Sequence, residues 1–258
     1  LLINVGLYAP KISEIQGAGH TSPLVGQSVI DVAGIVTAVD SNGFYFQDPN
    51  PDDDIATSEA LFVFTEGAPT VAVGNSITVS GTISEFTPGG TSTRNLSTTQ
   101  IAFPDTVTVL SSGNPLPEAI IIGGEGRIPP TENIDNDAFD TFDPETSGID
   151  FFESLEAMRV TGTDLVAVAG TNRFGEIFTI TGDNASGLSE RGTLNISPDD
   201  FNPERIQVNY DSGIFEFEFP DVNVGDFLGD VTGVLGYNFG NFEIFPTEDF
   251  TANIVPAG

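Results

Sequence analysis

The residue types that carry out acid–base and nucleophilic chemistry are scarce in this chain. There is one histidine, His20, in the sequence Gly-Ala-Gly-His-Thr, and there is no cysteine. A two-histidine acid–base site, a histidine-rich zinc site and a thiolate nucleophile therefore cannot be assembled. No Gly-x-Ser-x-Gly elbow occurs, and the glycine-rich stretch 123–126 lacks the Gly-Lys-Ser/Thr of a phosphate-binding loop. We expect no catalytic residues and no enzyme activity, with His20 packed in its loop.

Carboxylates, in contrast, are abundant, with 38 Asp and Glu against 7 Lys and Arg. Carboxylate and carbonyl oxygens in flexible loops suit calcium, which takes about six to eight of them. The acids gather in three clusters: Asp48, Asp52, Asp53 and Asp54; Asp135, Asp137, Asp140, Asp143, Glu145 and Asp150; and Asp199, Asp200 and Asp211. None has the spacing of an EF-hand loop. Two interpretations therefore stay open: calcium binds at one of the clusters, or all three are solvated acidic loops. We expect no other cofactor. A paired-carboxylate glycosidase stays open, although no spacing selects a pair.

The elements that must position these residues are strands. Short β-branched or alternating runs are separated by Gly, Asn, Asp and Pro, which indicates strands and turns. The expected strands cover 29–39, 44–47, 60–65, 76–86 and one or two within 99–110. Gly34 and Gly81 interrupt two of them, as in the bent strands of small barrels. Helical periodicity is confined to 150–158, where Asp150 is the expected N-cap. We predict an all-β fold of two tandem OB-like Greek-key barrels.

A weak repeat supports two barrels. Val-Gly followed by an apolar strand and a further glycine occurs at Val25-Gly26, Val73-Gly74 and Val224-Gly225. The alternative is that Val-Gly turns are common in any β protein. The expected organisation is an N-terminal apolar strand over 1–11, barrel 1 over 12–110, a linker over 111–117 and barrel 2 over 118–258, with long acidic insertions near 129–148 and 183–203.

The net charge of −31 limits the partners of this chain. Such a field repels phosphate backbones and anionic lipid. Aromatic residues that could stack on bases are present at 44–46, 62 and 64, but basic residues beside them are absent. The apolar runs are also far shorter than a membrane span. We expect no direct nucleic-acid binding and no membrane insertion. Asn95, Asn184 and Asn195 begin Asn-x-Ser sequons, which matter only if the source glycosylates exported proteins.

Several segments resemble a known family. In order they are ISEIQG from Ile12, SPLVG from Ser22, GIVTAV from Gly34, GFYFQDP from Gly43 and FVFT from Phe62. This series is similar to the OB-like region that precedes the catalytic domain in large secreted bacterial nucleases of the endonuclease/exonuclease/phosphatase superfamily. A looser resemblance runs from Leu155 to Thr247, and the chain stops where the catalytic domain of that family would start. The resemblance implies an extracellular, secreted bacterial module with an accessory role.

A different function competes with that role. The first seven residues, LLINVGL, are apolar and β-competent. An exposed strand of this kind pairs with the edge of another sheet. The alternative function is a self-assembling subunit of an extracellular filament or matrix, whose partner is a protein or a second copy. The assembly residues would be Leu1, Leu2, Ile3, Val5 and Leu7; pairing of this strand within its own chain is the other possibility.

Overall fold

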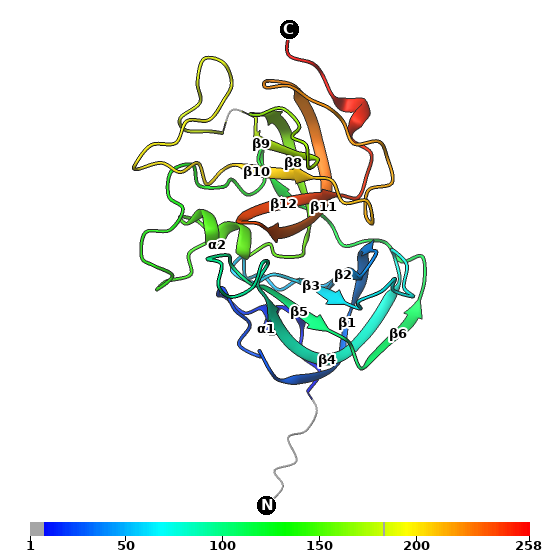
Figure 1. The fold of residues 1–258 in the computed structure, drawn as a ribbon. Helices are drawn as coiled ribbons and strands as arrows, with labels where there is room; N and C mark the ends of the chain where they lie inside the picture. Colours follow the sequence, from blue (N-terminus) through cyan, green and yellow to red (C-terminus); the bar gives the residue numbers. More distant parts are fainter. Residues whose placement is uncertain (1–7, 183) are drawn as a thin grey trace, which may run out of the picture.

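The computed structural model describes residues 8–182 and 184–258, and it contains two closed five-stranded barrels in tandem (Figure 1). The predicted all-β fold of two OB-like barrels is therefore confirmed. The N-terminal residues to which we assigned assembly, Leu1, Leu2, Ile3, Val5 and Leu7, lie outside the described residues. Among the described residues, no helix has the length and apolar character needed to cross a membrane.

Barrel 1 closes through pairing of its first and fourth strands. Its elements are α1 (Ile12–Gln16), β1 (Ser28–Asp40), β2 (Gly43–Gln47), β3 (Ala60–Phe64), β4 (Ser76–Phe86), β5 (Thr98–Ala102) and the appended β6 (Thr106–Ser111). The strand order is β1-β2-β3-β5-β4, with β4 pairing back to β1 and with β3 and β5 parallel. This is the order of an OB barrel.

Barrel 2 repeats the same order. Its elements are β7 (Ile120–Ile122), α2 (Gly148–Glu153), β8 (Arg159–Ala167), β9 (Glu176–Thr181), β10 (Ile206–Asn209), β11 (Phe227–Asn238), β12 (Asn241–Pro246) and η1 (Thr251–Asn253). The order β8-β9-β10-β12-β11 closes by pairing of β11 with β8, and β10 and β12 are parallel. Each barrel also places a short helix before its first long strand. The two halves therefore share one topology.

Glycine permits the close strand contacts that the barrels need. A Cβ atom on Gly34 in β1 would lie 2.7 Å from the Phe46 ring on β2. In β11, a Cβ on Gly233 would lie 2.1 Å from the main-chain oxygen of Phe245 on β12. Neither distance is tolerable for a real side chain. The glycine interruption predicted within the first strand is thus a point where a neighbouring strand packs against bare backbone.

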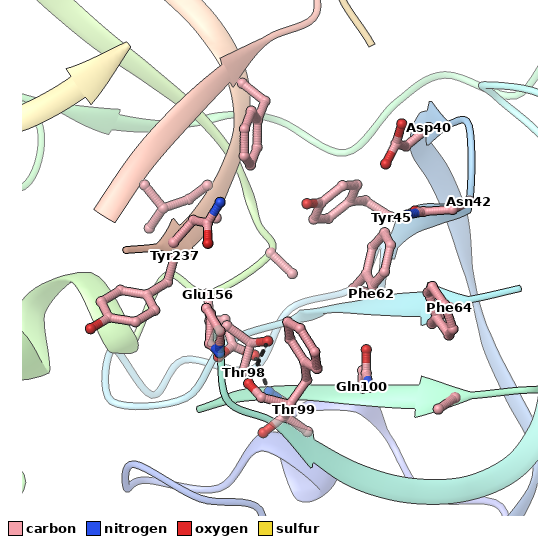
Figure 2. Close-up of a pocket in the computed structure, with 18 of the residues that line it drawn as sticks. Asp40, Asn42, Tyr45, Phe62, Phe64, Thr98, Thr99, Gln100, Glu156 and Tyr237 are labelled. Atoms are coloured by element: carbon pink, nitrogen blue, oxygen red, sulfur yellow. Dashed lines mark hydrogen bonds between the residues drawn. The ribbon is translucent and has the colours of Figure 1, made fainter. Parts of the chain in front are cut away.

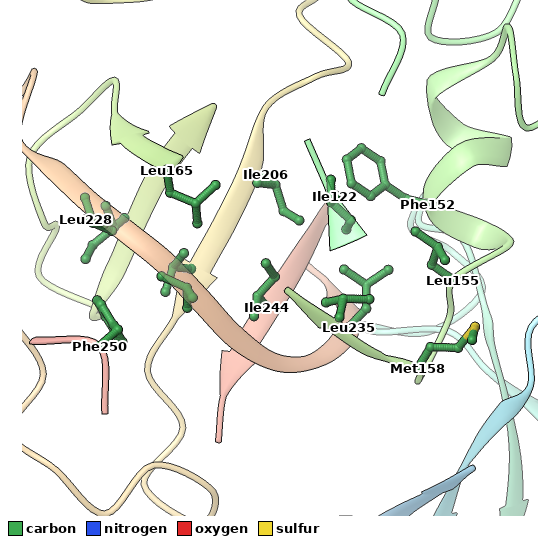
Figure 3. Close-up of a cluster of buried hydrophobic side chains, with 14 of the residues drawn as sticks. Ile122, Phe152, Leu155, Met158, Leu165, Ile206, Leu228, Leu235, Ile244 and Phe250 are labelled. Atoms are coloured by element: carbon green, nitrogen blue, oxygen red, sulfur yellow. The ribbon is translucent and has the colours of Figure 1, made fainter. Parts of the chain in front are cut away.

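Each barrel encloses its own apolar core. Residues from β1 to β5, among them Phe44, Phe46 and Ile77, fill barrel 1. Barrel 2 is filled from β8 to β12, and Phe152 and Leu155 pack at one side of that cluster (Figure 3). Burial of each large side chain stabilises the fold by about 1.5–3 kcal/mol. Ala60 of β3 belongs to the core cluster of barrel 2, so the barrels also share apolar contacts.

Both bounds predicted for the helix within 150–158 are wrong, because α2 covers Gly148–Glu153. We expected a helix from Asp150 with that residue as N-cap, but α2 begins at Gly148 and follows Ser147 as its N-cap. Asp150 lies inside the helix and is 1 % exposed. Its carboxylate accepts a hydrogen bond from the main-chain N–H of Asp143 (2.8 Å). Asp150 therefore stabilises the loop that precedes α2 and does not cap the helix.

Candidate ligand-binding cleft

A cleft of about 610 Å³ lies between the two barrels (Figure 2). Barrel 1 contributes the outer face of β2, β3 and β5, and barrel 2 contributes β11, the turn after it and part of β12. A volume of this size holds a small organic ligand, since such sites commonly measure about 300–1,000 Å³. The β2–β3 face is also the surface that OB barrels use to bind ligands.

Strand alternation places aromatic rings on the cleft side. On β2, Phe44 and Phe46 turn into the core, so Tyr45 between them points outward. Phe62 on β3 stands opposite Tyr45 in the register, with ring centroids 4.8 Å apart. Phe64 at the end of β3 makes an edge contact with Phe103, the residue after β5, with ring centroids 5.3 Å apart. These two aromatic pairs form the wall that barrel 1 presents to the cleft.

Barrel 2 supplies the facing aromatic residues. Tyr237 is the second-to-last residue of β11, and its hydroxyl accepts a hydrogen bond from the Leu96 N–H of barrel 1 (3.1 Å). Phe239 follows in the turn and is 76 % exposed. Phe103 on the opposite side is 63 % exposed. Neither of these exposed rings belongs to the core of a barrel, so both are free to contact a ligand.

Acids and amides line the cleft, together with the hydroxyl residues Thr98 and Thr99 and two tyrosines. Asp40, Asn42, Gln100, Glu156 and Asp211 all line it, and among the described lining residues there is no Lys, Arg or His. Burial, together with the neighbouring carboxylate of Asp40, raises the pKa of Asp211 above its usual value. The lining offers hydrogen-bond acceptors and amide donors, without a positive charge.

Glu156 forms the floor where the barrels meet. Its Oε1 accepts hydrogen bonds from the main-chain N–H of Thr99 (2.9 Å) and from Nε2 of Gln16 (3.2 Å). Its main-chain oxygen accepts one from the Ser58 hydroxyl. Burial raises the pKa of Glu156 to about 8, so the carboxyl is mostly protonated at neutral pH. A residue of barrel 2 thus binds three segments of barrel 1.

The single histidine lies away from this cleft. Nε2 of His20 is 2.9 Å from Oδ1 of Asp150. Its ring makes edge contacts with Phe139 and Phe142, at 4.7 and 5.2 Å between centroids. Those contacts tie the N-terminal loop of barrel 1 to the acidic loop before α2. The environment of His20 is that of a packed side chain.

The first predicted calcium cluster occupies the loop between β2 and β3. Asp48, Asp52 and Asp54 each accept a hydrogen bond from the main-chain N–H two residues later (2.8, 2.8 and 3.0 Å). These are Asx turns. Asp53 is exposed. The adjacent Glu59, which we did not predict, is buried and accepts from the Asp52 N–H (2.7 Å).

The second predicted cluster lies in the loop before α2. Asp137 accepts hydrogen bonds from the N–H groups of Asp140 and Thr141, and Asp135 accepts from the N–H of Asp137. Asp143 accepts from the Thr146 hydroxyl (2.8 Å). Across residues 8–182 and 184–258, no group of three or more His, Cys, Asp or Glu is arranged to hold a metal ion. Many of the predicted carboxylates are used to fold their own loops.

The barrel 2 half of the cleft was not predicted from the sequence: Glu156, Tyr237 and Phe239 were not named as site residues, and Asp211 was named only as a candidate calcium ligand. One signal did point to a covered outer face. All three residues of Phe44-Tyr45-Phe46 are aromatic, whereas a strand with one solvated face alternates apolar and polar residues. The outward Tyr45 indicates that something packs on that side. It does not indicate that the second barrel does so.

A model of a family described as a domain of unknown function (DUF8508) matches residues 120–256. This range contains β7 to β12, α2 and η1, and therefore the barrel 2 side of the cleft. No curated protein and no solved structure matches the chain.

Proposed function

The chain belongs to the family described as a domain of unknown function (DUF8508), and from that premise we propose that it is a non-catalytic extracellular binding module. Its ligand lies in the interbarrel cleft. The observation that carries the proposal is the chemistry of the lining, in which exposed aromatic rings stand beside acids and amides. A lining without positive charge among its described residues favours an uncharged ligand or a cation over an anion.

We propose an uncharged oligosaccharide as the ligand. Sugar rings present apolar C–H faces that pack on aromatic rings, and their hydroxyls donate to carboxylate and amide oxygens. OB barrels bind oligosaccharides or oligonucleotides on the face equivalent to β2–β3. An oligonucleotide would bring its phosphates toward a chain of net charge −31. Of these two ligand classes, the net charge of the chain therefore favours the oligosaccharide.

The test is calorimetric titration with neutral oligosaccharides of increasing length, with single-stranded DNA as a comparison. Phe103→Ala and Phe239→Ala remove exposed cleft rings. Each should weaken binding about fivefold or more, because truncating a contact ring costs over about 1 kcal/mol. Phe174→Ala is the matched control, since Phe174 is 63 % exposed and contacts Arg173 outside the cleft. Equal losses in all three variants, or no binding by the intact chain, would contradict the proposal.

The extracellular accessory role is supported by the resemblance of barrel 1 to the region before the catalytic domain of secreted nucleases. In that setting, the module anchors an attached enzyme to a glycan-rich surface. Its acidic composition, with a net charge of −31, is compatible with this role because it keeps the module soluble. A fusion of the chain to a fluorescent protein should be retained on polysaccharide particles. Retention equal to that of the fluorescent protein alone would contradict it.

Self-assembly is a second candidate, and one observation favours it. β6 is the last strand of its sheet, and within residues 8–182 and 184–258 its one strand partner is β4. It carries no charged residue, and Val109 and Leu110 are exposed. An uncharged, exposed edge is an acceptor for strand addition. We propose residues 1–7 of a second copy as the added strand, because LLINVGL is apolar and long enough to pair with β6.

A further inference from the structure

A second cavity, of about 220 Å³, lies near α2, which Figure 1 shows beside the junction of the two barrels. Its lining comes from the loop between β4 and β5, the loop before α2, α2 itself, the residues before β10 and the turn between β11 and β12. Sites for drug-sized ligands measure about 300–1,000 Å³, so this smaller cavity suits a compound with a single ring.

The charge of this lining is opposite to that of the chain. Two of the seven Lys and Arg residues, Arg94 and Arg205, line the cavity, and its described lining contains no Asp or Glu. Within the part of the chain that the structure describes, ion pairs are formed by His20 and Arg159, so neither guanidinium group of the cavity is paired with a carboxylate. Both guanidinium groups can therefore bind an anion from outside the chain.

Two contacts fix the position of Arg205. One of its terminal nitrogens donates a hydrogen bond to Oδ1 of Asn241 (2.8 Å), and its guanidinium carbon lies 4.5 Å from the centroid of the Phe178 ring. The acid next to it in sequence, Glu204, is not part of the lining, and its carboxylate accepts a hydrogen bond from the Ser186 N–H (3.0 Å). A guanidinium has five N–H donors, so donors remain for a ligand.

The segment that carries Arg94 reaches the same turn of barrel 2. A Cβ atom built on Gly240 would lie 3.7 Å from Oδ1 of Asn95. Arg94 precedes Asn95 in the chain, and the residue after Gly240 is Asn241, to which Arg205 donates. The turn between β11 and β12 therefore brings the two arginines to one cavity, although they come from different barrels.

Aromatic rings form much of the remaining wall. Phe152 of α2 and Phe242 of β12 stack, with ring centroids 5.2 Å apart and 22° between the ring planes. Phe139 and Phe201 also line the cavity, and they are 50 % and 55 % exposed. Exposed rings beside a cavity can pack against the face or edge of a ring in a ligand.

We propose that this cavity binds a small aromatic carboxylate, whose ring packs among the phenylalanines and whose carboxylate accepts hydrogen bonds from Arg94 and Arg205. A carboxylate is planar and matches the paired N–H groups of a guanidinium. The net charge of −31 repels an anion at long range, but salt at physiological concentration screens this repulsion beyond about 8 Å, whereas the arginines act at contact. The cavity is lined differently from the interbarrel cleft, so the inference does not depend on the oligosaccharide.

Calorimetric titration of the full chain with phenylacetate tests the cavity. Phenylacetate has about ten heavy atoms, for which we expect saturable binding with a Kd of about 1 mM or below. Phenylacetamide keeps the ring and loses the charge, and acetate keeps the charge and loses the ring. Each should bind at least about tenfold more weakly, since hydrogen bonds to a charged group are the stronger ones. Equal affinity for phenylacetamide, or no binding of phenylacetate, would overturn the inference.

Variants place the ligand in the cavity. Arg94→Gln and Arg205→Gln should each weaken phenylacetate binding about tenfold or more. Arg173→Gln is the control, because it makes the same change of charge at an exposed position outside the cavity and should leave binding unchanged. Arg94 forms no ion pair with the described residues, so its variant keeps the test valid if Arg205→Gln fails to fold. Unchanged affinity in Arg94→Gln, or an equal loss in Arg173→Gln, would contradict the assignment.

Discussion

Glu156 is a buried acid of barrel 2 whose carboxyl group accepts hydrogen bonds from barrel 1. Its folded pKa of about 8 exceeds the ordinary glutamate value of 4.5 because burial penalises the charged form. The stability that the neutral carboxyl contributes is complete below pH 4.5 and is lost as the pH rises through 8. We expect the free energy of unfolding, and with it the melting temperature, to fall between about pH 4.5 and pH 8; this group lowers the free energy by up to about 1.4 kcal/mol per pH unit.

Glu156→Gln tests that attribution. The glutamine keeps the oxygen that accepts from Thr99 and Gln16 but cannot ionise, so the fall in melting temperature with pH should become smaller. Glu118→Gln removes an exposed acid and should leave the fall unchanged. An identical pH dependence in both variants would show that Glu156 is not the group responsible. Burial also raises the pKa of Glu59 and Glu204 to about 7, that of Glu243 to about 8 and that of Glu153 well above its ordinary value, so these acids contribute to the remaining decline.

At the level of the elements, strand pairing gives a prediction about assembly. If residues 1–7 add to β6 of a neighbour, the intact chain should form larger species at high concentration with moderate salt, which screens its charge. Val109→Lys places a charge on the acceptor edge and should reduce the mass measured by light scattering to that of a monomer. Val73→Lys, at a similarly exposed position outside the strands, is the control. A monomeric intact chain under all these conditions contradicts assembly.

Most strands could be predicted from the sequence, and the reasons are local. β4 begins and ends as predicted, because a β-branched run is bounded by turn residues. The start of α2 was missed, because Asp150 and Ser147 are both capping residue types and only tertiary burial of Asp150 distinguishes them. Likewise, α1 has only five residues, too few to show a helical period.

At the level of the whole molecule, charge and the isolation of His20 predict that the chain cleaves neither DNA nor RNA. His20 contacts Asp150 between two phenylalanines, and the net charge of −31 repels phosphate. Plasmid DNA and RNA incubated with the purified chain and magnesium, manganese or calcium should stay intact. Cleavage that disappears in a variant of the chain's own acids, such as Asp40→Asn, would refute this prediction.

The cleft itself could not be predicted from the sequence. Its walls come from β2, β3 and β5 on one side and from β11 on the other, more than a hundred residues away. Local patterns identify the outward Tyr45 and Phe62, but their position opposite Tyr237 depends on how the barrels pack.

Whether the interbarrel cleft binds an uncharged oligosaccharide is decided by a chemical-shift titration of the isotope-labelled chain with neutral oligosaccharides. We predict saturable shifts of the amides of residues 98–103 on barrel 1 and 237–239 on barrel 2, which form the two walls of the cleft. Amides in the loop 187–204 and along β6 should keep their positions. Shifts centred on those segments, or no shifts with any saccharide of the panel, would contradict the claim.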